Sequence, residues 1–308
     1  RLEDMTPCIA CLQGCVANMY AGNPVCCLTN PFLGHEAEPI EKTENPKKVM
    51  VIGGGVAGLC AAFIAKEKGH EVTLYEAGDV LGGNMRLAAY PPGKGDITNM
   101  IRSYIHRCQK DGVKIVMSCE VTPELIKEEK PDSVIIATGS KTLILPIEGI
   151  DNPAIIHGSD LLDGKRAAGK KVLVVGGGMV GCETAAFLGE QEHDVTVIEF
   201  RDTVGADVIH EHRVYLMKDF EDYGIKEITG AKVCKFYEDG VEYETADGVR
   251  HETRGYDSVI LSMGFRNYNP LEEKIKDLVP ETHVIGDAIR ARRALDATKE
   301  AYEVASRI

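Results

Sequence analysis

The pattern of apolar and polar residues predicts two similar strand–helix–strand segments in this chain. Residues 49–52 form an apolar run that leads into a glycine-rich turn, and an alanine-rich apolar stretch then continues to about residue 68. The stretch predicts a helix, and the next apolar run, at residues 71–75, predicts a second strand. A similar order begins again at residue 171. The chain is therefore predicted to be an α/β protein with a repeated unit.

The turn after the first apolar run carries a spacing with a specific physical use. Gly53, Gly55 and Gly58 stand in the order G-x-G-x-x-G. The first glycine permits a tight turn, the second lets the backbone approach a pyrophosphate, and the third lets the helix lie close to the strand. Glu76 ends the second strand, 23 residues after Gly53, where a carboxylate can accept hydrogen bonds from an adenosine ribose. The segment predicts a dinucleotide site, in which the diphosphate meets the helix N-terminus.

Two later loops add candidate contacts to this site. A second glycine pair at residues 82–83, followed by Asn84, offers backbone amides over the same diphosphate. Residues 132–137 predict a buried strand that runs into Thr138 and Gly139. Near the end of the chain, another short strand leads into Gly286 and Asp287, and residues 288–308 predict a helix. A carboxylate at that place either accepts a hydrogen bond from a cofactor polyol or simply caps the helix.

The repeat extends over a whole domain. Residues 171–199 match residues 48–76 at a constant offset of 123, and the later strand and Gly139 return at residues 257–261 and at Gly264. Two copies of one unit predict two dinucleotide sites; the alternative is that the second copy is a degenerate scaffold. The motif residues that return, which argue against that alternative, are Gly176, Gly178, Gly181 and Glu199. A carboxylate at Glu199 favours NADH, because it pairs with a free ribose 2′-hydroxyl and repels a 2′-phosphate. Arg201 could weaken that preference.

The first 45 residues are irregular and rich in cysteine. Cys8, Cys11 and Cys15 are separated by two and three residues, and eleven more residues lead to Cys27. Four thiolates from one loop indicate iron–sulfur or zinc, and three crowded cysteines with a short return favour a cubane [4Fe–4S] cluster. Zinc and plain thiols are the alternatives. Spacing alone does not choose between Cys26 and Cys27 as the fourth ligand.

Composition narrows the class of protein. The 308 residues suggest about two domains, and an apolar content of 44% is ample for two cores. A formal charge of −13 without a basic cluster argues against nucleic acid or an anionic membrane surface as a partner. No signal peptide is expected, because cysteines stand where its apolar core would be, and the cysteine usage predicts a reducing, cytoplasmic location. The start at arginine rather than methionine suggests a fragment or a processed product.

The order of these motifs resembles one family over essentially the whole chain. The four cysteines, with Leu-Thr-Asn-Pro after Cys27, are followed by VIGGGVAGL, LGGN, IIATGS, VVGGG and VIGDA. This order is similar to the C-terminal half of the NADH:flavin oxidoreductases related to 2,4-dienoyl-CoA reductase, enoate reductases, bile-acid steroid-CoA oxidoreductases and trimethylamine dehydrogenase. The resemblance implies Cys27 as the fourth cluster ligand. It also implies that FAD binds the first Rossmann-like unit and NAD(H) the second.

The resemblance implies a glutathione-reductase-like fold of two three-layer α/β domains, with the nicotinamide domain inserted into the flavin domain. The expected boundaries are residues 1–45 for the cluster segment and linker, 46–142 and 268–308 for the FAD domain, and 143–267 for the NAD(H) domain. Asn84 departs from the glutamine usual in the family, and Val121 would contact FAD through its backbone. Together, the motifs and the resemblance give as cofactor-binding candidates Gly53, Gly55, Ala57, Gly58, Glu76, Gly83, Asn84, Arg86, Lys94, Val121, Ala137, Thr138, Gly139, Gly286 and Asp287 for FAD, and Gly176, Gly178, Gly181, Glu199 and Gly264 for NAD(H).

The functional hypothesis is an electron-input module that passes a hydride from NADH to FAD and electrons to the cluster. In the family an N-terminal FMN-binding barrel holds the substrate, of enoate or enoyl-CoA type; that barrel is the expected partner, and a homo-oligomer stays open. Hydride transfer needs orientation rather than a side-chain acid or base, so no catalytic residue is nominated. The alternatives are a disulfide reductase, which lacks a suitable cysteine pair here, a subunit similar to the small subunit of glutamate synthase, and a redox-silent scaffold with a structural metal.

Overall fold

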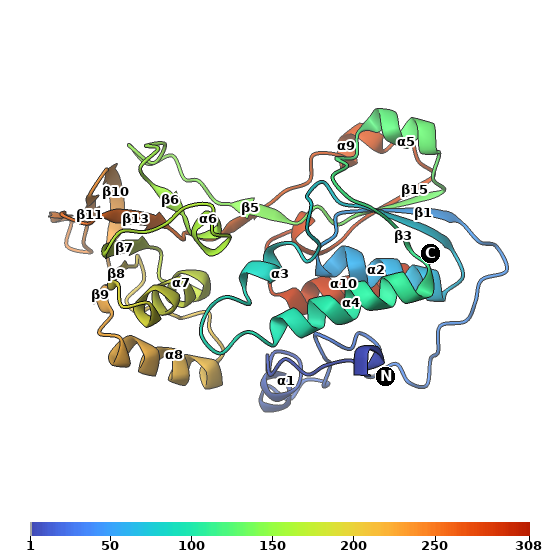
Figure 1. Ribbon diagram of the computed structural model, residues 1–308, viewed down its shortest axis with the longest axis horizontal. Coiled ribbons are helices and arrows are strands. Elements are labelled where there is room, and N and C mark those ends of the chain that lie inside the picture. The colour runs from blue at the N-terminus through green and yellow to red at the C-terminus, as the bar shows by residue number, and fades with distance from the viewer. Residues whose placement is uncertain (1) are drawn as a thin grey trace. The chain divides into compact units, whose positions relative to one another are not determined.

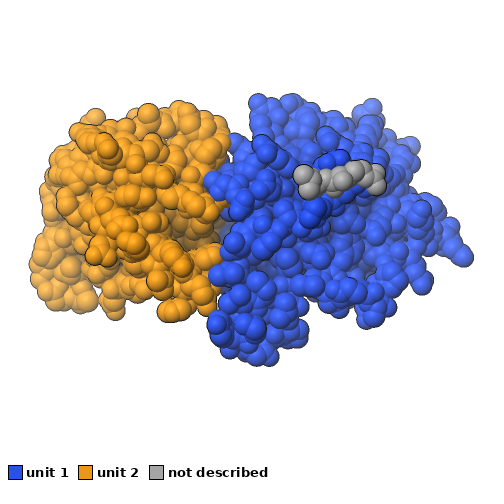
Figure 2. Space-filling model, turned by 60° about the horizontal axis from the view of Figure 1, so that its bottom comes forward, with its two compact units in different colours: residues 1–89, 95–141, 266–308 blue, residues 90–94, 142–265 orange. Residues whose placement is uncertain are grey.

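The computed structural model describes residues 2–308, which divide into two compact units. The first unit comprises the described residues up to 89 together with residues 95–141 and 266–308, and the second comprises residues 90–94 and 142–265 (Figure 2). Each unit has its own parallel sheet and its own apolar cores. The two chain segments that lead from one unit to the other pair as a ribbon of β5 (Ser140–Thr142) and β14 (Phe265–Asn267).

Within residues 2–308, the sheet of the first unit is five-stranded and parallel, in the order β15-β4-β1-β2-β3. Successive residues of β1 point to opposite faces: Val49 and Val51 join the core beneath α2, α4 and α10, whereas Met50 and Ile52 join the core beneath α5 and α9 (Figure 1). Because both faces are covered, the strand is apolar at four successive positions. The strands are β1 (Lys48–Ile52), β2 (Glu71–Tyr75), β3 (Lys114–Val116), β4 (Ser133–Ile136) and β15 (Glu281–Val284).

The helices of the first unit are those that the apolar periodicity predicts, with one shift. The predicted helix over residues 288–308 begins only at residue 294, because the chain first makes a 3-10 turn, η2, in which Gly286 has a left-handed φ of +63°. The helices are α1 (Val16–Tyr20), α2 (Val56–Glu67), α3 (Asn84–Leu87), α4 (Ile97–Asp111), α5 (Pro123–Glu129), α9 (Glu272–Ile275) and α10 (Ala294–Ala305), with 3-10 turns η1 (Leu2–Asp4) and η2 (Gly286–Ala288).

The second unit, all of whose residues are described, repeats the parallel sheet in the order β6-β13-β7-β8-β9. The pairing of β7 with β8 keeps the register of β1 with β2, since Lys171 lies opposite Asp194 as Lys48 lies opposite Glu71. An antiparallel sheet of β10, β11 and β12 covers one face, where helices cover it in the first unit. The elements are β6 (Ile156–His157), α6 (Gly158–Leu162), β7 (Lys171–Val175), α7 (Met179–Glu190), β8 (Asp194–Ile198), α8 (His210–Asp222), β9 (Lys226–Ile228), β10 (Lys232–Tyr237), β11 (Gly240–Glu244), β12 (Arg250–Thr253) and β13 (Ser258–Leu261).

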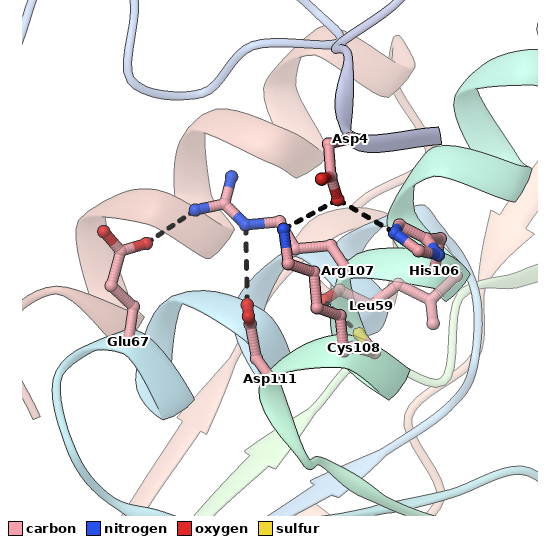
Figure 3. A network of polar contacts seen from close by, with 8 residues as sticks. Asp4, Leu59, Glu67, His106, Arg107, Cys108 and Asp111 are labelled. Carbon is pink, nitrogen blue, oxygen red and sulfur yellow. Dashed lines mark hydrogen bonds and ion pairs between the residues drawn. The ribbon is translucent and has the colours of Figure 1, made fainter. Parts of the chain in front are cut away.

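The cysteine-rich segment is tied to helix α4 by polar and aromatic contacts. Asp4 accepts hydrogen bonds from His106 at 3.1 Å and from Lys110 at 2.6 Å (Figure 3). The guanidinium of Arg107 lies over the rings of Phe32 and Phe63, at 4.6 and 4.3 Å from their centroids. These contacts link the two ends of an otherwise irregular segment to a regular helix.

The same helix holds the return of the cysteine loop. The hydroxyl of buried Tyr104 donates to the carbonyl oxygens of Leu28 and Thr29, at 3.1 and 3.3 Å, directly after Cys27. In residues 2–308, no helix is both long and apolar enough to cross a membrane.

Candidate functional site

The first glycine turn is built so closely that side chains are excluded. Gly53 has a φ of +109°, and a Cβ there would overlap the carbonyl oxygen of Ala137 at the end of β4. A Cβ on Gly58 would overlap the carbonyl oxygen of Gly53. Helix α2 therefore starts against the turn, with Gly55 as its N-cap, and no described side chain caps it. The N–H groups of its first turn are thus available to a phosphate.

Glu76 and the second glycine pair complete the turn. The two carboxylate oxygens of Glu76 accept hydrogen bonds from the backbone N–H groups of Gly54 at 2.6 Å and Gly78 at 2.7 Å. The N–H of Gly82 donates to the carbonyl oxygen of Gly54 at 2.8 Å, and a Cβ on Gly83 would come within 3.1 Å of the Cα of Gly55. The two glycine loops therefore lie backbone against backbone, as a site for a diphosphate requires.

The end of the chain returns to the same place. Asn84 donates to the hydroxyl of Ser140 at 3.3 Å, and that hydroxyl donates to Asp287 at 2.8 Å. Gly286 allows the close approach of α2 and α10, because a Cβ there would lie 3.1 Å from the Cβ of Ala57 and 3.2 Å from that of Ala297. The structure thus brings together three predicted segments that are more than fifty residues apart in sequence.

The remaining predicted FAD residues of the first unit are less directly connected. Ala137 and Val121 are buried, the latter in the core beneath α5 and α9. The hydroxyl of Thr138 donates to the carbonyl oxygen of Tyr268 at 2.5 Å, and the carbonyl oxygen of Gly139 accepts from the N–H of Tyr268 at 2.9 Å. Arg86 lies on the short helix α3 beside Asn84.

The second glycine turn has the same construction as the first. Gly176 has a φ of +105°, and a Cβ there would overlap the carbonyl oxygen of Ser262, while a Cβ on Gly181 would overlap that of Gly176. Glu199 accepts from the N–H groups of Gly177 at 2.5 Å and Arg201 at 2.9 Å.

Two further contacts belong to the second turn. Met179, the first residue of α7 after the N-cap Gly178, donates its N–H to the carboxylate of Asp207 at 2.8 Å. The carbonyl oxygen of Gly264 accepts from the N–H of Leu143 at 2.9 Å.

The sequence reasoning missed a functional candidate in Glu183. This residue lies on α7, its side chain is only 10% exposed, and it accepts a hydrogen bond from the ammonium of Lys94, a predicted FAD contact. Burial raises the pKa of Glu183, and the neighbouring Lys94 opposes that rise. Both residues belong to the second unit. A charged residue at a buried position of a helix that is otherwise apolar was the signal available in the sequence.

The cysteines are all free thiols, and all of them lie within the described residues. Burial raises the pKa of Cys182 and of Cys108 to about 12, so these two stay protonated and unreactive. Cys11 lies near Cys27, Cys15 and Cys8: burial is the main cause of its raised pKa, and the charges of those three thiolates add to it. In residues 2–308, no three His, Cys, Asp or Glu side chains are grouped as they would be around a single metal ion.

Comparison with known proteins defines the class. The family described as pyridine nucleotide-disulphide oxidoreductase matches residues 47–279. A cinnamate reductase of Clostridium sporogenes is 32% identical over 312 residues, which cover 100% of this chain and 46% of that protein. An NADH oxidase of Thermoanaerobacter brockii is 33% identical and covers 100% of this chain and 48% of that protein. The solved structure of a 2-naphthoyl-CoA reductase complex aligns with a TM-score of 0.95 and 32% identity, over 100% of this chain and 47% of that one.

The chain belongs to the pyridine nucleotide-disulphide oxidoreductase family, an oxidoreductase class that uses FAD and NAD(P)H. The resemblance to the NADH:flavin oxidoreductases related to enoate reductases is confirmed, as is the predicted α/β fold with Rossmann-like units. The chain spans about half the length of these relatives.

Proposed function

We propose that this chain is an electron-input module, which accepts a hydride from NADH onto FAD and passes the electrons on to a [4Fe–4S] cluster. The observation that carries the proposal is the presence, in one chain, of two glycine turns of the same construction and a cysteine loop held to the first unit by Tyr104. Each turn places a helix N-terminus and a strand-end carboxylate where a dinucleotide needs them. A hydride carries two electrons, whereas a cluster accepts them singly, and FAD supplies the chemistry that connects the two.

The residues of the cysteine loop fit such a cluster. Ala10 and Leu12, on either side of Cys11, have left-handed φ angles of +51° and +56°. Alternation of this kind turns successive backbone N–H groups inward into a concavity, which suits a negatively charged iron–sulfur centre. A Cβ on Gly14 would overlap the carbonyl oxygen of Cys26, so glycine there allows the two cysteine-bearing segments to meet. The thiols of Cys8, Cys11, Cys15 and Cys27 would hold the cluster.

We further propose that the module serves an FMN-binding barrel that carries the substrate site. The support is that relatives about twice as long include proteins named cinnamate reductase and bilirubin reductase. A substrate of enoate or enoyl-CoA type is the proposal that these names favour.

An anaerobic visible spectrum tests the proposed function. The purified protein is expected to show flavin bands and a broad cluster shoulder at about 400 nm, both bleached by NADH. A colourless protein that contains zinc would contradict the proposal. A protein with flavin bands that NADH bleaches, but without iron, would restrict the function to the NADH-to-FAD step.

Replacing Cys27 by serine is expected to remove the cluster, and replacing Cys26 is expected to leave it. Cys27 is one of the thiols whose charge acts on Cys11, and its sulfur lies 3.3 Å from the hydroxyl of Thr29. The sulfur of Cys26 instead accepts a hydrogen bond from Asn18 at 3.4 Å. Iron per chain should fall from about four to near zero in Cys27→Ser. Iron lost from Cys26→Ser and kept in Cys27→Ser would assign the fourth ligand to Cys26.

Replacing Glu199 by serine is expected to relax the preference for NADH. Serine removes the carboxylate that would repel a 2′-phosphate, and the side chain of Arg201 remains close by to attract one. The ratio of kcat/KM for NADH to that for NADPH should fall by about tenfold or more. Glu76→Ser, in the first unit, is the matched control and should leave that ratio unchanged. An unchanged ratio in Glu199→Ser would assign the preference to another residue.

A further inference from the structure

We propose that Asp207 sets the affinity and the release rate of the nicotinamide nucleotide by holding, in the free protein, the place that the nucleotide diphosphate must take. The proposal rests on the assignment of the second glycine turn to NAD(H). It concerns a residue outside the glycine motif, in the loop that follows β8.

Asp207 lies at the positive end of helix α7. One oxygen of its carboxylate accepts the N–H of Met179, the first residue of the helix, at 2.8 Å. The other oxygen lies 3.5 Å from the position that a Cβ on Gly178 would have, so the carboxylate rests over the glycine turn. A helix N-terminus attracts anions because its first N–H groups are unpaired and the helix dipole is positive there. The carboxylate thus makes the contact that a diphosphate oxygen would make.

The first repeat shows what this position does when the charge is absent. Asn84 is the equivalent of Asp207 at the offset of 123. The two loops are built alike, since Gly82 donates to Gly54 at 2.8 Å and Gly205 donates to Gly177 at 2.7 Å.

The side chains at the two equivalent positions point to different partners. The amide of Asn84 reaches Ser140, and no described side chain caps α2. The flavin turn is therefore open and carries no charge at this position, whereas the nicotinamide turn contains its own anion.

This difference matches the different tasks of the two cofactors. FAD has to stay bound through many turnovers, so an open helix N-terminus favours it. A nicotinamide nucleotide has to leave after each hydride transfer. When it binds, it must displace the carboxylate from Met179 and approach a like charge, which weakens binding and speeds release. When it leaves, the carboxylate can cap the helix again.

The test replaces Asp207 by asparagine, which is the residue of the first repeat and keeps the shape without the charge. Calorimetric titration with ADP-ribose should show a Kd about tenfold lower in Asp207→Asn than in the unchanged protein at low salt, with a smaller difference at high salt. Adenosine, which has no diphosphate, should bind both proteins equally. Asp207→Ser, with a shorter capping group and no charge, should behave as Asp207→Asn does.

The reciprocal variant, Asn84→Asp, should weaken reconstitution with FAD by about tenfold and leave ADP-ribose binding unchanged. Equal or weaker binding of ADP-ribose by both Asp207 variants would overturn the role of Asp207 and leave the nicotinamide assignment intact. If no protein of the set binds ADP-ribose, the nicotinamide assignment fails, and the role of Asp207 fails with it.

Discussion

Replacing Gly58 by alanine is expected to abolish FAD binding, whereas replacing its counterpart Gly181 should abolish NADH binding and leave FAD in place. A Cβ at either position overlaps a backbone carbonyl oxygen, that of Gly53 or that of Gly176, in the turn itself. A backbone atom cannot move aside as the end of a flexible side chain can, so the helix has to shift away from the strand. Overpacking of this kind costs about 1–3 kcal/mol of folding free energy and displaces the N–H groups that face the diphosphate.

The measurement is the FAD content per chain, by absorbance, together with the rate of flavin bleaching by NADH. Gly95→Ala is the control, because no described atom lies within 4 Å of the position of its Cβ and its φ is not left-handed. It should keep both properties. If Gly58→Ala keeps its flavin and Gly181→Ala loses it, the two turns have been assigned to the wrong cofactors.

Replacing Lys94 by methionine is expected to destabilise the second unit strongly. The ammonium of Lys94 is the partner of the Glu183 carboxylate, which is 10% exposed. Without it, a buried charge is left uncompensated, which costs on the order of 3–5 kcal/mol. Denaturant unfolding monitored by circular dichroism should show the loss. Lys218→Met, which removes a solvent-exposed partner of Asp222, is the control and should leave the midpoint unchanged.

The loss in Lys94→Met should depend on pH in a defined direction. Burial raises the folded-state pKa of Glu183, so the folded protein holds this proton more tightly than the unfolded chain does. Stability from this group is therefore greatest below the unfolded pKa of about 4.3 and falls as pH rises through the folded pKa. Removing Lys94 raises the folded pKa further. The variant should thus lie closest to the unchanged protein at acidic pH and farthest from it at neutral pH and above.

Glu183→Gln should rescue Lys94→Met, because the double variant has no buried charge. Its unfolding free energy should lie well above that of Lys94→Met and should show no such pH dependence. A double variant as unstable as Lys94→Met would mean that packing by the lysine stem, rather than its charge, stabilises this place.

Local patterns in the sequence were sufficient for the parts of the fold in which neighbours in sequence are also neighbours in space. The apolar runs predict β1 and β7, because a strand covered on both faces has to be apolar throughout. The glycine spacings predict both turns, because Gly58 and Gly181 each contact a carbonyl oxygen only five residues before them. The predicted start of the last helix was six residues early, because a left-handed φ at Gly286 is a property of the backbone path rather than of apolar periodicity.

What the sequence by itself determined is therefore the repeat, the two glycine turns with their terminal acids, and the cysteine spacing. Only the tertiary structure decided which residues meet across long stretches of chain. Lys94 pairs with Glu183 over 89 residues. Tyr104 holds the carbonyl groups that follow Cys27. Of two equivalent positions, Asn84 reaches Ser140 and Asp207 reaches the N-terminus of α7. Such contacts depend on how the chain packs, because the partners of a polar side chain are the groups that folding brings within about 3 Å of it, and residue spacing does not encode them.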